Sequence, residues 1–270
     1  MDFDPTREPA TPRDAATVIL LRADAQRQAE VFLLRRHRGA SFMAQSFVFP
    51  GGIRDEGEDL RRTAARELFE EAGVLLADRA LSNSQLETWR TRQAAGEVLE
   101  DLLSEAQAAL SLEGIVPFAH WITPSAEKRR YSALFFVGLL PEGQTPSFDA
   151  KETVDELWIT PRAALERAAE LLLPPPQIRC LEEIATIAEA GPEAVLEFAR
   201  EREAHLEPPI VPRYAEAPDL AEGFMLLLPW DPDYETLGQG LGEAFWAGHP
   251  LGGGPSRFTR QDGAWRSFGA

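Results

Sequence analysis

Five short runs of the chain are rich in aliphatic, aromatic and β-branched residues, the composition of β-strands. They cover residues 15–22, 30–36, 116–122, 131–140 and 153–160. A polar stretch separates the first two runs and has the length of a hairpin connection. The pattern therefore predicts a sheet whose strands come from two distant parts of the chain.

A helical pattern replaces the strand pattern at residues 59–72. Apolar side chains recur at every fourth position from Leu60 to Ala72 and form one stripe. Gly73 stands where a glycine often ends a helix. Before the helix, Gly51 and Gly52 follow a proline, and this predicts a sharp backbone turn in which glycine relieves crowding.

The rest of the chain is mainly helical in pattern, with a different composition near its end. Helices are predicted within residues 81–111 and at 162–172, 177–190 and 192–205. Three prolines at 174–176 predict a stiff joint. We therefore expect a first domain over residues 1–175, with a helical insertion at about 81–111. A C-terminal extension of helices and short strands, including one at 224–228, covers residues 176–270.

The order of these elements indicates the fold class. Strands and helices do not alternate regularly, and the chain has no glycine-rich phosphate loop that ends in Gly-Lys-Ser or Gly-Lys-Thr. The pattern favours an α+β sandwich over a doubly wound parallel sheet.

The net charge of the chain limits the kinds of molecule that it is expected to bind. The net charge is −17 over 270 residues, and such a surface repels polyanions, so nucleic acid is not an expected partner. The excess carboxylates either keep the protein soluble or gather metal ions, and composition alone leaves both readings open.

Other features bear on the compartment. Cys180 is the single cysteine, which excludes an internal disulfide framework and is typical of a buried small side chain in a reducing environment. Residues 1–12 lack the pattern of a secretory signal, and the longest apolar run, 133–140, is too short to cross a membrane. We expect a cytoplasmic protein without a membrane partner, and a homodimer stays open.

Three glutamates on the helix at 59–72 carry the candidate chemistry. Glu67, Glu70 and Glu71 stand at positions i, i+3 and i+4, so their carboxylates share one helix face. Like charges at this spacing repel each other, and a bound cation would offset the repulsion. Oxygen ligands favour Mg²⁺ or Mn²⁺ over zinc. Arg66 can hold one of these carboxylates, and Glu58 can orient Arg66.

The spacing of this stretch carries a family resemblance. Residues 52–74 read G-x₅-E-x₇-R-E-U-x-E-E-x-G-U, where U is aliphatic, and fit every position of the Nudix box. The chain therefore resembles the Nudix hydrolases. The resemblance implies the Nudix fold, an α/β/α sandwich with a mixed sheet, and a metal site formed by Glu67, Glu70 and Glu71.

The resemblance also implies a reaction, the attack of a metal-activated water on phosphorus in a nucleoside-diphosphate compound. Arg66 belongs to the catalytic set that it implies. A further carboxylate is expected in a Glu-x₃-Glu-x-Trp context, which Glu152 matches in the segment 152–158. Glu152 is therefore a candidate metal ligand or general base, with an ordinary surface glutamate as the alternative.

The flanking segments indicate a substrate class. Residues 42–52, 121–124, 129–136 and 173–176 resemble the branch of the family that includes organellar coenzyme A diphosphatases. The chain departs from the signature of other coenzyme A hydrolases at Ser41 and Gln45. ADP-ribose, dinucleotides and nucleotide sugars therefore stay open as substrates, as does a ligand sensor without turnover.

Two arginines and two glycines are the candidate substrate-binding residues. The guanidinium groups of Arg129 and Arg130 match phosphate oxygens in shape and charge, with an exposed basic turn as the alternative. Gly51 and Gly52 are expected to let the backbone approach the substrate.

Overall fold

The computed structural model describes residues 8–39, 43–246 and 248–269. Ser41 and Phe42, which entered the comparison with coenzyme A hydrolases, lie outside these residues. The strands are β1 (Arg13–Ala23), β2 (Ala29–Arg36), β3 (Phe47–Val48), β4 (Gly51–Ile53), β5 (Ile115–Ile122), β6 (Tyr131–Leu139), β7 (Thr153–Ile159), β8 (Arg213–Glu216), β9 (Phe224–Leu227), β10 (Arg257–Gln261) and β11 (Ala264–Phe268). The helices are α1 (Leu60–Ala72), α2 (Asn83–Ala94), α3 (Leu99–Glu105), α4 (Pro161–Glu166), α5 (Pro175–Ala185) and α6 (Pro192–Arg202), with 3-10 turns at Leu112–Gly114, Ala188–Ala190 and Glu203–His205.

The described residues form a large mixed sheet with β1 at its centre. Its order is β3-β2-β1-β6-β5, and β4 and β7 add to β1 and β2. Strand β1 runs parallel to β6 and antiparallel to β2 and β4. The five strands predicted from the hydrophobic pattern are confirmed, and so is the mixed sheet.

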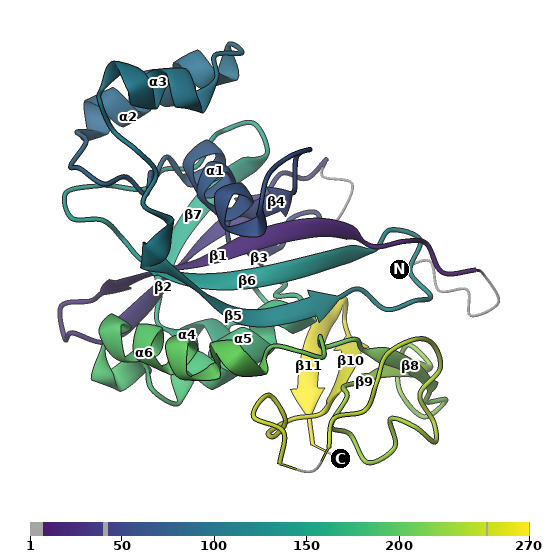
Figure 1. Ribbon diagram of the computed structural model, residues 1–270. Coiled ribbons are helices and arrows are strands. Elements are labelled where there is room, and N and C mark those ends of the chain that lie inside the picture. Colours follow the sequence, from purple (N-terminus) through teal and green to yellow (C-terminus); the bar gives the residue numbers. More distant parts are fainter. Residues whose placement is uncertain (1–7, 40–42, 247, 270) are drawn as a thin grey trace.

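Helices cover both faces of this sheet (Figure 1). Along β1, Val18 and Leu20 face α1, whereas Ile19 and Leu21 belong to the larger core on the side of α5 and α6. Because successive side chains of a strand point to opposite faces, a strand buried on both sides reads as a continuous apolar run. The predicted α+β sandwich of the Nudix fold is confirmed.

The predicted helix at 59–72 is α1, and both of its ends are capped. Asp59 accepts a hydrogen bond from the backbone N–H of Arg62 at 2.9 Å. Gly73 ends the helix with a φ of 67°, in the left-handed region where glycine carries no steric cost. The apolar stripe from Ala64 to Ala72 is buried against the sheet.

The insertion predicted at about 81–111 is helical and consists of α2 and α3. These two helices stand beyond α1, away from the main sheet (Figure 1). Trp89, Leu99 and Leu102 form a separate small core with Phe69, which reaches out of α1. The insertion therefore packs on α1 and not on the sheet.

The stiff joint predicted at the three prolines is wrong. Pro174 precedes α5, and Pro175 and Pro176 occupy its first turn. A helix tolerates proline there because the first N–H groups have no partner within the helix. Since α5 and α6 pack on the main sheet, the packing does not break at residue 175, where the first domain was expected to end.

The C-terminal part adds a second sheet with the order β11-β10-β9-β8, and its strand β9 confirms the one expected at 224–228. Leu226, Phe258 and Trp265 from this sheet join the same core as α5. The helix expected at 162–172 is shorter and ends at Glu166 as α4. Within the described residues, no helix has the length and apolar character needed to span a bilayer.

Candidate active site

Two glycines bring strand β4 into close contact with its neighbours. Gly51 pairs with Thr17 and Gly52 pairs with Ala16 of β1. A Cβ atom on Gly51 would lie 2.4 Å from the carbonyl oxygen of Ala16, and one on Gly52 would lie 2.5 Å from the carboxyl of Glu67. Neither glycine has a positive φ. The expected sharp turn at these glycines is therefore wrong, because they serve close packing within a strand.

Glu71 is buried at this contact between strand and helix. Only 5% of its surface is exposed, and its Oε2 atom accepts the backbone N–H of Gly51 at 2.9 Å. Burial raises the pKa of Glu71 to about 8, and the neighbouring Glu67 contributes to the increase. Burial likewise raises the pKa of Glu67 to about 7. The surroundings of both carboxyl groups thus disfavour their ionised forms, chiefly through burial.

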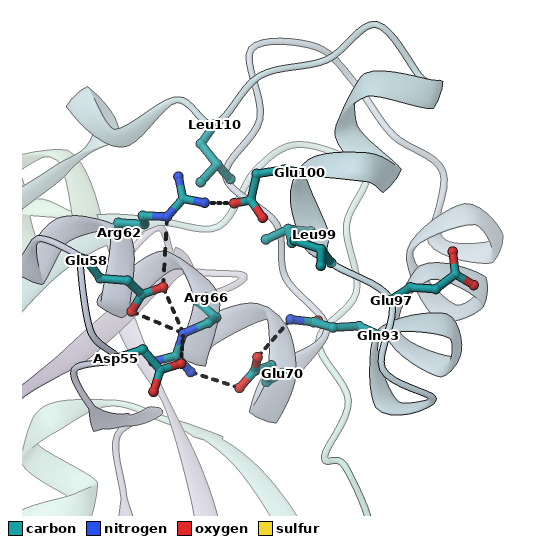
Figure 2. Close-up of a pocket in the computed structure, with 11 residues that line it drawn as sticks. Asp55, Glu58, Arg62, Arg66, Glu70, Gln93, Glu97, Leu99, Glu100 and Leu110 are labelled. Carbon is teal, nitrogen blue, oxygen red and sulfur yellow. Dashed lines mark hydrogen bonds and ion pairs between the residues drawn. The ribbon is translucent and has the colours of Figure 1, made fainter.

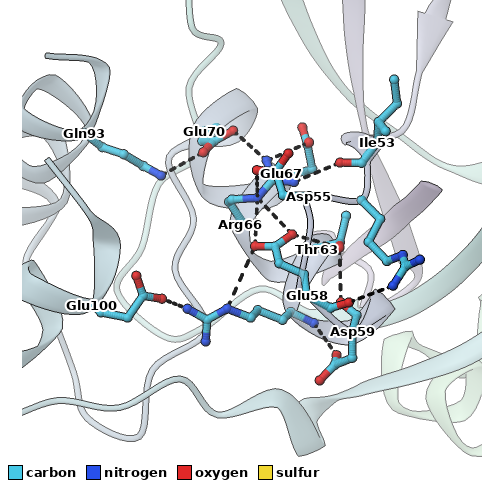
Figure 3. A network of polar contacts seen from close by, with 12 residues as sticks. Ile53, Asp55, Glu58, Asp59, Thr63, Arg66, Glu67, Glu70, Gln93 and Glu100 are labelled. Atoms are coloured by element: carbon cyan, nitrogen blue, oxygen red, sulfur yellow. Dashed lines mark hydrogen bonds and ion pairs between the residues drawn. The ribbon is translucent and has the colours of Figure 1, made fainter. Parts of the chain in front are cut away.

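Arg66 connects the carboxylates of the box (Figure 3). Its Nε donates to Glu58 at 3.1 Å, and one terminal nitrogen donates to Glu67 at 2.8 Å and to Glu70 at 3.1 Å. The other terminal nitrogen donates to the carbonyl of Ile53 at 2.9 Å. Although burial alone would raise it, the hydrogen bond and charge of Arg66 lower the pKa of Glu58. As expected, Arg66 holds carboxylates of the cluster, and Glu58 contacts Arg66.

Glu152 lies in the loop before β7 and is exposed. Its charge contributes to the raised pKa values of Glu67 and Glu71, so the structure brings it to the same site. Asp149 shapes this loop by accepting the backbone N–H groups of Glu152 at 3.0 Å and of Thr153 at 2.8 Å. The sequence analysis missed Asp149, although an aspartate just before a strand is a typical turn former.

Arg36, at the end of β2, is a second residue that the sequence analysis missed. Its positive charge acts to lower the pKa of Glu71, and its Nε atom is buried without a hydrogen-bond partner among the described atoms. Nothing in the local sequence separates Arg36 from its basic neighbours, because its place near Glu71 depends on how β2 and α1 pack.

The two arginines expected to meet phosphate differ in their surroundings. Arg130 is buried and donates to the carbonyl oxygens of Thr123 at 3.0 Å and Ala10 at 2.8 Å. These bonds join the connection between β5 and β6 to the segment before β1, so Arg130 has a structural role there. Arg129 is exposed beside it, and its role as a phosphate ligand stays a prediction. Cys180 is buried, as expected.

The chemistry of the box residues fits a hard divalent cation. Carboxylate oxygens are the ligands that Mg²⁺ and Mn²⁺ prefer. Burial first, and neighbouring glutamates second, raise the pKa values of Glu67 and Glu71, and a cation would offset both effects. Within the described residues no three carboxylate, imidazole or thiol groups converge closely enough to hold an ion. Glu67 and Glu70 turn to Arg66 instead. Each carboxylate has about four lone-pair sites, so these bonds leave sites free for a cation, which would draw the carboxylates closer together.

Comparison with known proteins agrees with the fold and the box. The model of the NUDT19 Nudix domain matches residues 58–187. The acyl-coenzyme A diphosphatase NUDT19 of Xenopus laevis is 24% identical over 229 residues, with 59% of this chain and 60% of that protein covered. The peroxisomal coenzyme A diphosphatase ndx-8 of Caenorhabditis elegans is 38% identical over 82 residues, with 30% of this chain and 35% of that protein covered.

The fold is similar to the crystal structure of a Nudix hydrolase from Alicyclobacillus acidocaldarius, with a TM-score of 0.55 and 25% sequence identity. The superposition covers 67% of this chain and 96% of that one. The chain thus spans between about a third and three fifths of the two curated relatives. These matches confirm the resemblance to the Nudix hydrolases in the box and in the fold. The resemblance to the branch with coenzyme A diphosphatases is likewise confirmed.

Proposed function

We propose that this protein is a metal-dependent diphosphohydrolase that cleaves the diphosphate bond of coenzyme A or an acyl-coenzyme A. The observation that carries the proposal is the pair of the partly buried Glu67 and the buried Glu71, whose pKa values burial raises to about 7 and about 8. Burying ionisable carboxyls is costly unless a cation offsets their charge. Such a pair is unfavourable for stability alone and useful for binding a cation.

The residues of the site would have different roles in hydrolysis. A bound Mg²⁺ or Mn²⁺ supplies charge against the diphosphate and lowers the pKa of a water. Glu67, Glu70 and Glu71 would hold the cation, with Glu71 oriented by the N–H of Gly51 and the other two by Arg66. Glu152 is exposed beside them and is our candidate for the group that takes the proton from the attacking water.

The choice of substrate rests on the relatives. Two proteins that match parts of this chain are named as coenzyme A diphosphatases. Hydrolysis at the diphosphate of coenzyme A would release adenosine 3′,5′-bisphosphate and phosphopantetheine, or acyl-phosphopantetheine from an acylated substrate. ADP-ribose, dinucleotides and nucleotide sugars contain the same diphosphate linkage and differ in the groups that flank it.

A product screen tests this proposal. Coenzyme A, an acyl-coenzyme A, ADP-ribose, a dinucleotide and a nucleotide sugar would each be incubated with Mg²⁺, with Mn²⁺ and with a chelator, and the products separated by chromatography. We expect cleavage of the coenzyme A compounds with either metal and none with chelator. Glu71→Gln should be inactive while keeping the fold, as measured by circular dichroism.

Two results would redirect the proposal. Faster cleavage of another compound would change the substrate and keep the reaction. If no compound were cleaved while one of them raised the melting temperature, the protein would be a ligand sensor. Full activity of Glu71→Gln would refute the assignment of the site.

A further inference from the structure

Side chains of α2 connect the helical insertion to α1. The side-chain nitrogen of Gln93 donates to Oε1 of Glu70 at 2.7 Å. Arg90, one helical turn earlier, donates from Nε to the backbone carbonyl of Glu70 at 2.8 Å, and its terminal nitrogen donates to the carbonyl of Glu71. Figure 2 shows Gln93 pointing from the insertion to Glu70, and both residues line a cavity of about 280 Å³.

Glu70 depends on side chains for its orientation more than its two neighbours do. Its side chain is 37% exposed, compared with 13% for Glu67, whereas Glu71 is buried and held by a backbone N–H. Arg66 donates to Oε2 of Glu70 and Gln93 donates to Oε1, so both carboxylate oxygens have a donor. Removal of Gln93 would leave Glu70 with a donor on one side alone.

The direction of the Gln93 amide is settled by what it faces. A carboxylate accepts hydrogen bonds and cannot donate them when ionised, so the NH₂ group of the amide must point to Glu70. The amide oxygen of Gln93 is then buried without a hydrogen-bond partner among the described atoms. Because such burial is unfavourable, the contact with Glu70 is the interaction that keeps the amide in this place.

Arg90 explains how Gln93 comes to face Glu70. Its guanidinium caps the carbonyls at the C-terminal turn of α1, where the helix dipole favours a positive charge. Another of its nitrogens donates to the carbonyl of Ser147 at 2.8 Å, in the loop that leads to Glu152. Residues three apart share a helix face, so α2 presents Gln93 to Glu70 when Arg90 is docked.

We propose that the helical insertion contributes to the metal site: Arg90 docks α2 on α1, and Gln93 positions the carboxylate of Glu70 for the divalent cation. This inference rests on the proposed function, since it takes Glu70 as a metal ligand. Gln93 is a positioning residue that acts through Glu70, and it touches neither the substrate nor the reacting atoms.

Mn²⁺ binding to the full chain tests the role of Gln93 without any substrate. The variant Gln93→Met keeps the length of the side chain and removes the amide, and free Mn²⁺ would be followed by electron paramagnetic resonance. We expect Mn²⁺ to bind about 10-fold more weakly, as is typical when a hydrogen bond to a metal ligand is lost. Arg92→Ala is the matched control, because Arg92 pairs with Glu97 and Glu105 inside the insertion. Its affinity should stay within about twofold of the unsubstituted protein.

A double-mutant cycle separates positioning from general loosening of the insertion. If Gln93 acts through Glu70, Gln93→Met should weaken Mn²⁺ binding no further in a Glu70→Gln background. Additive losses would show an independent structural effect and would overturn the inference. So would unchanged Mn²⁺ affinity in Gln93→Met alone, while leaving the proposed function intact. If the unsubstituted protein bound no Mn²⁺, the proposed function and this inference would both be refuted.

Discussion

Replacing Gly52 by alanine should disable the metal site while leaving the fold in place. The added methyl carbon would lie 2.5 Å from the carboxyl carbon and both oxygens of Glu67. Carbon atoms in contact are normally about 3.5 Å apart, so the Glu67 carboxylate would have to move by about 1 Å. A displacement of that size at a reacting centre costs about 100-fold in rate. We therefore expect hydrolysis by Gly52→Ala to fall by about two orders of magnitude.

Gly51→Ala is the matched comparison, because the same methyl group there meets backbone. It would lie 2.4 Å from the carbonyl oxygen of Ala16 and 2.7 Å from the Cα of Thr17. These atoms belong to the central strand β1, which cannot shift as a carboxylate can. Overpacking of this kind costs about 1–3 kcal/mol, and about 2–4 °C of melting temperature is lost per kcal/mol in a domain of this size.

The two variants should therefore separate function from stability. Metal-dependent product release and thermal melting would be measured for both under the same conditions. Gly52→Ala should lose activity with little change in melting temperature, and Gly51→Ala should melt several degrees lower. The steric argument is refuted if Gly52→Ala keeps activity within twofold of the parent, or if both variants lose stability equally.

Three further predictions concern the rest of the molecule. Burial raises the pKa of Glu67 to about 7 and of Glu71 to about 8, above the value of about 4.3 for an unfolded glutamate, so the unfolded state loses these protons first. The metal-free protein should thus be most stable with both carboxyls protonated and should lose stability as pH rises from about 4.5 to 8. Melting curves with chelator would check this, and a flat profile would contradict it. Cys180 should resist a thiol reagent in the native protein because burial raises the pKa of its thiol, and labelling as fast as in urea would argue otherwise. Leu226→Ala should cost about 2–5 kcal/mol and lower the midpoint of one urea transition, whereas a separate early transition would show that the small sheet unfolds alone.

Local patterns were sufficient to predict much of the fold and the centre of the site. Strand β1 is buried on both faces and is recognised from its continuous apolar run, and α1 is recognised from an apolar residue at every fourth position. Both patterns lie within the element itself. The contacts between Arg66, Glu58 and Glu70 follow from helical spacing and from the approach of the chain to α1. These features depend on residues that lie within about twenty positions of each other.

Features that depend on distant packing could not be predicted. The glycines of β4 look like a turn because the reason for them, Ala16 and the carboxyl of Glu67, lies elsewhere in the chain. Arg36 and Gln93 come close to the box only when β2 and α2 are in place. The prolines before α5 are compatible with both a joint and a helix start, and the packing of α5 on the sheet decides between them.

One hydrophobic core is shared by the main sheet, α5 and the small C-terminal sheet. This shared core limits which parts of the chain could be exchanged with those of another protein. The family match covers residues 58–187, but this stretch lacks β1, the central strand, and every strand of the small sheet. Leu226, Phe258 and Trp265 fill the same core as Ile19 and Leu21. The segment that the family model matches is thus smaller than the segment whose side chains fill this core. Exchanging the C-terminal part for that of another protein would therefore require repacking the layer behind the main sheet.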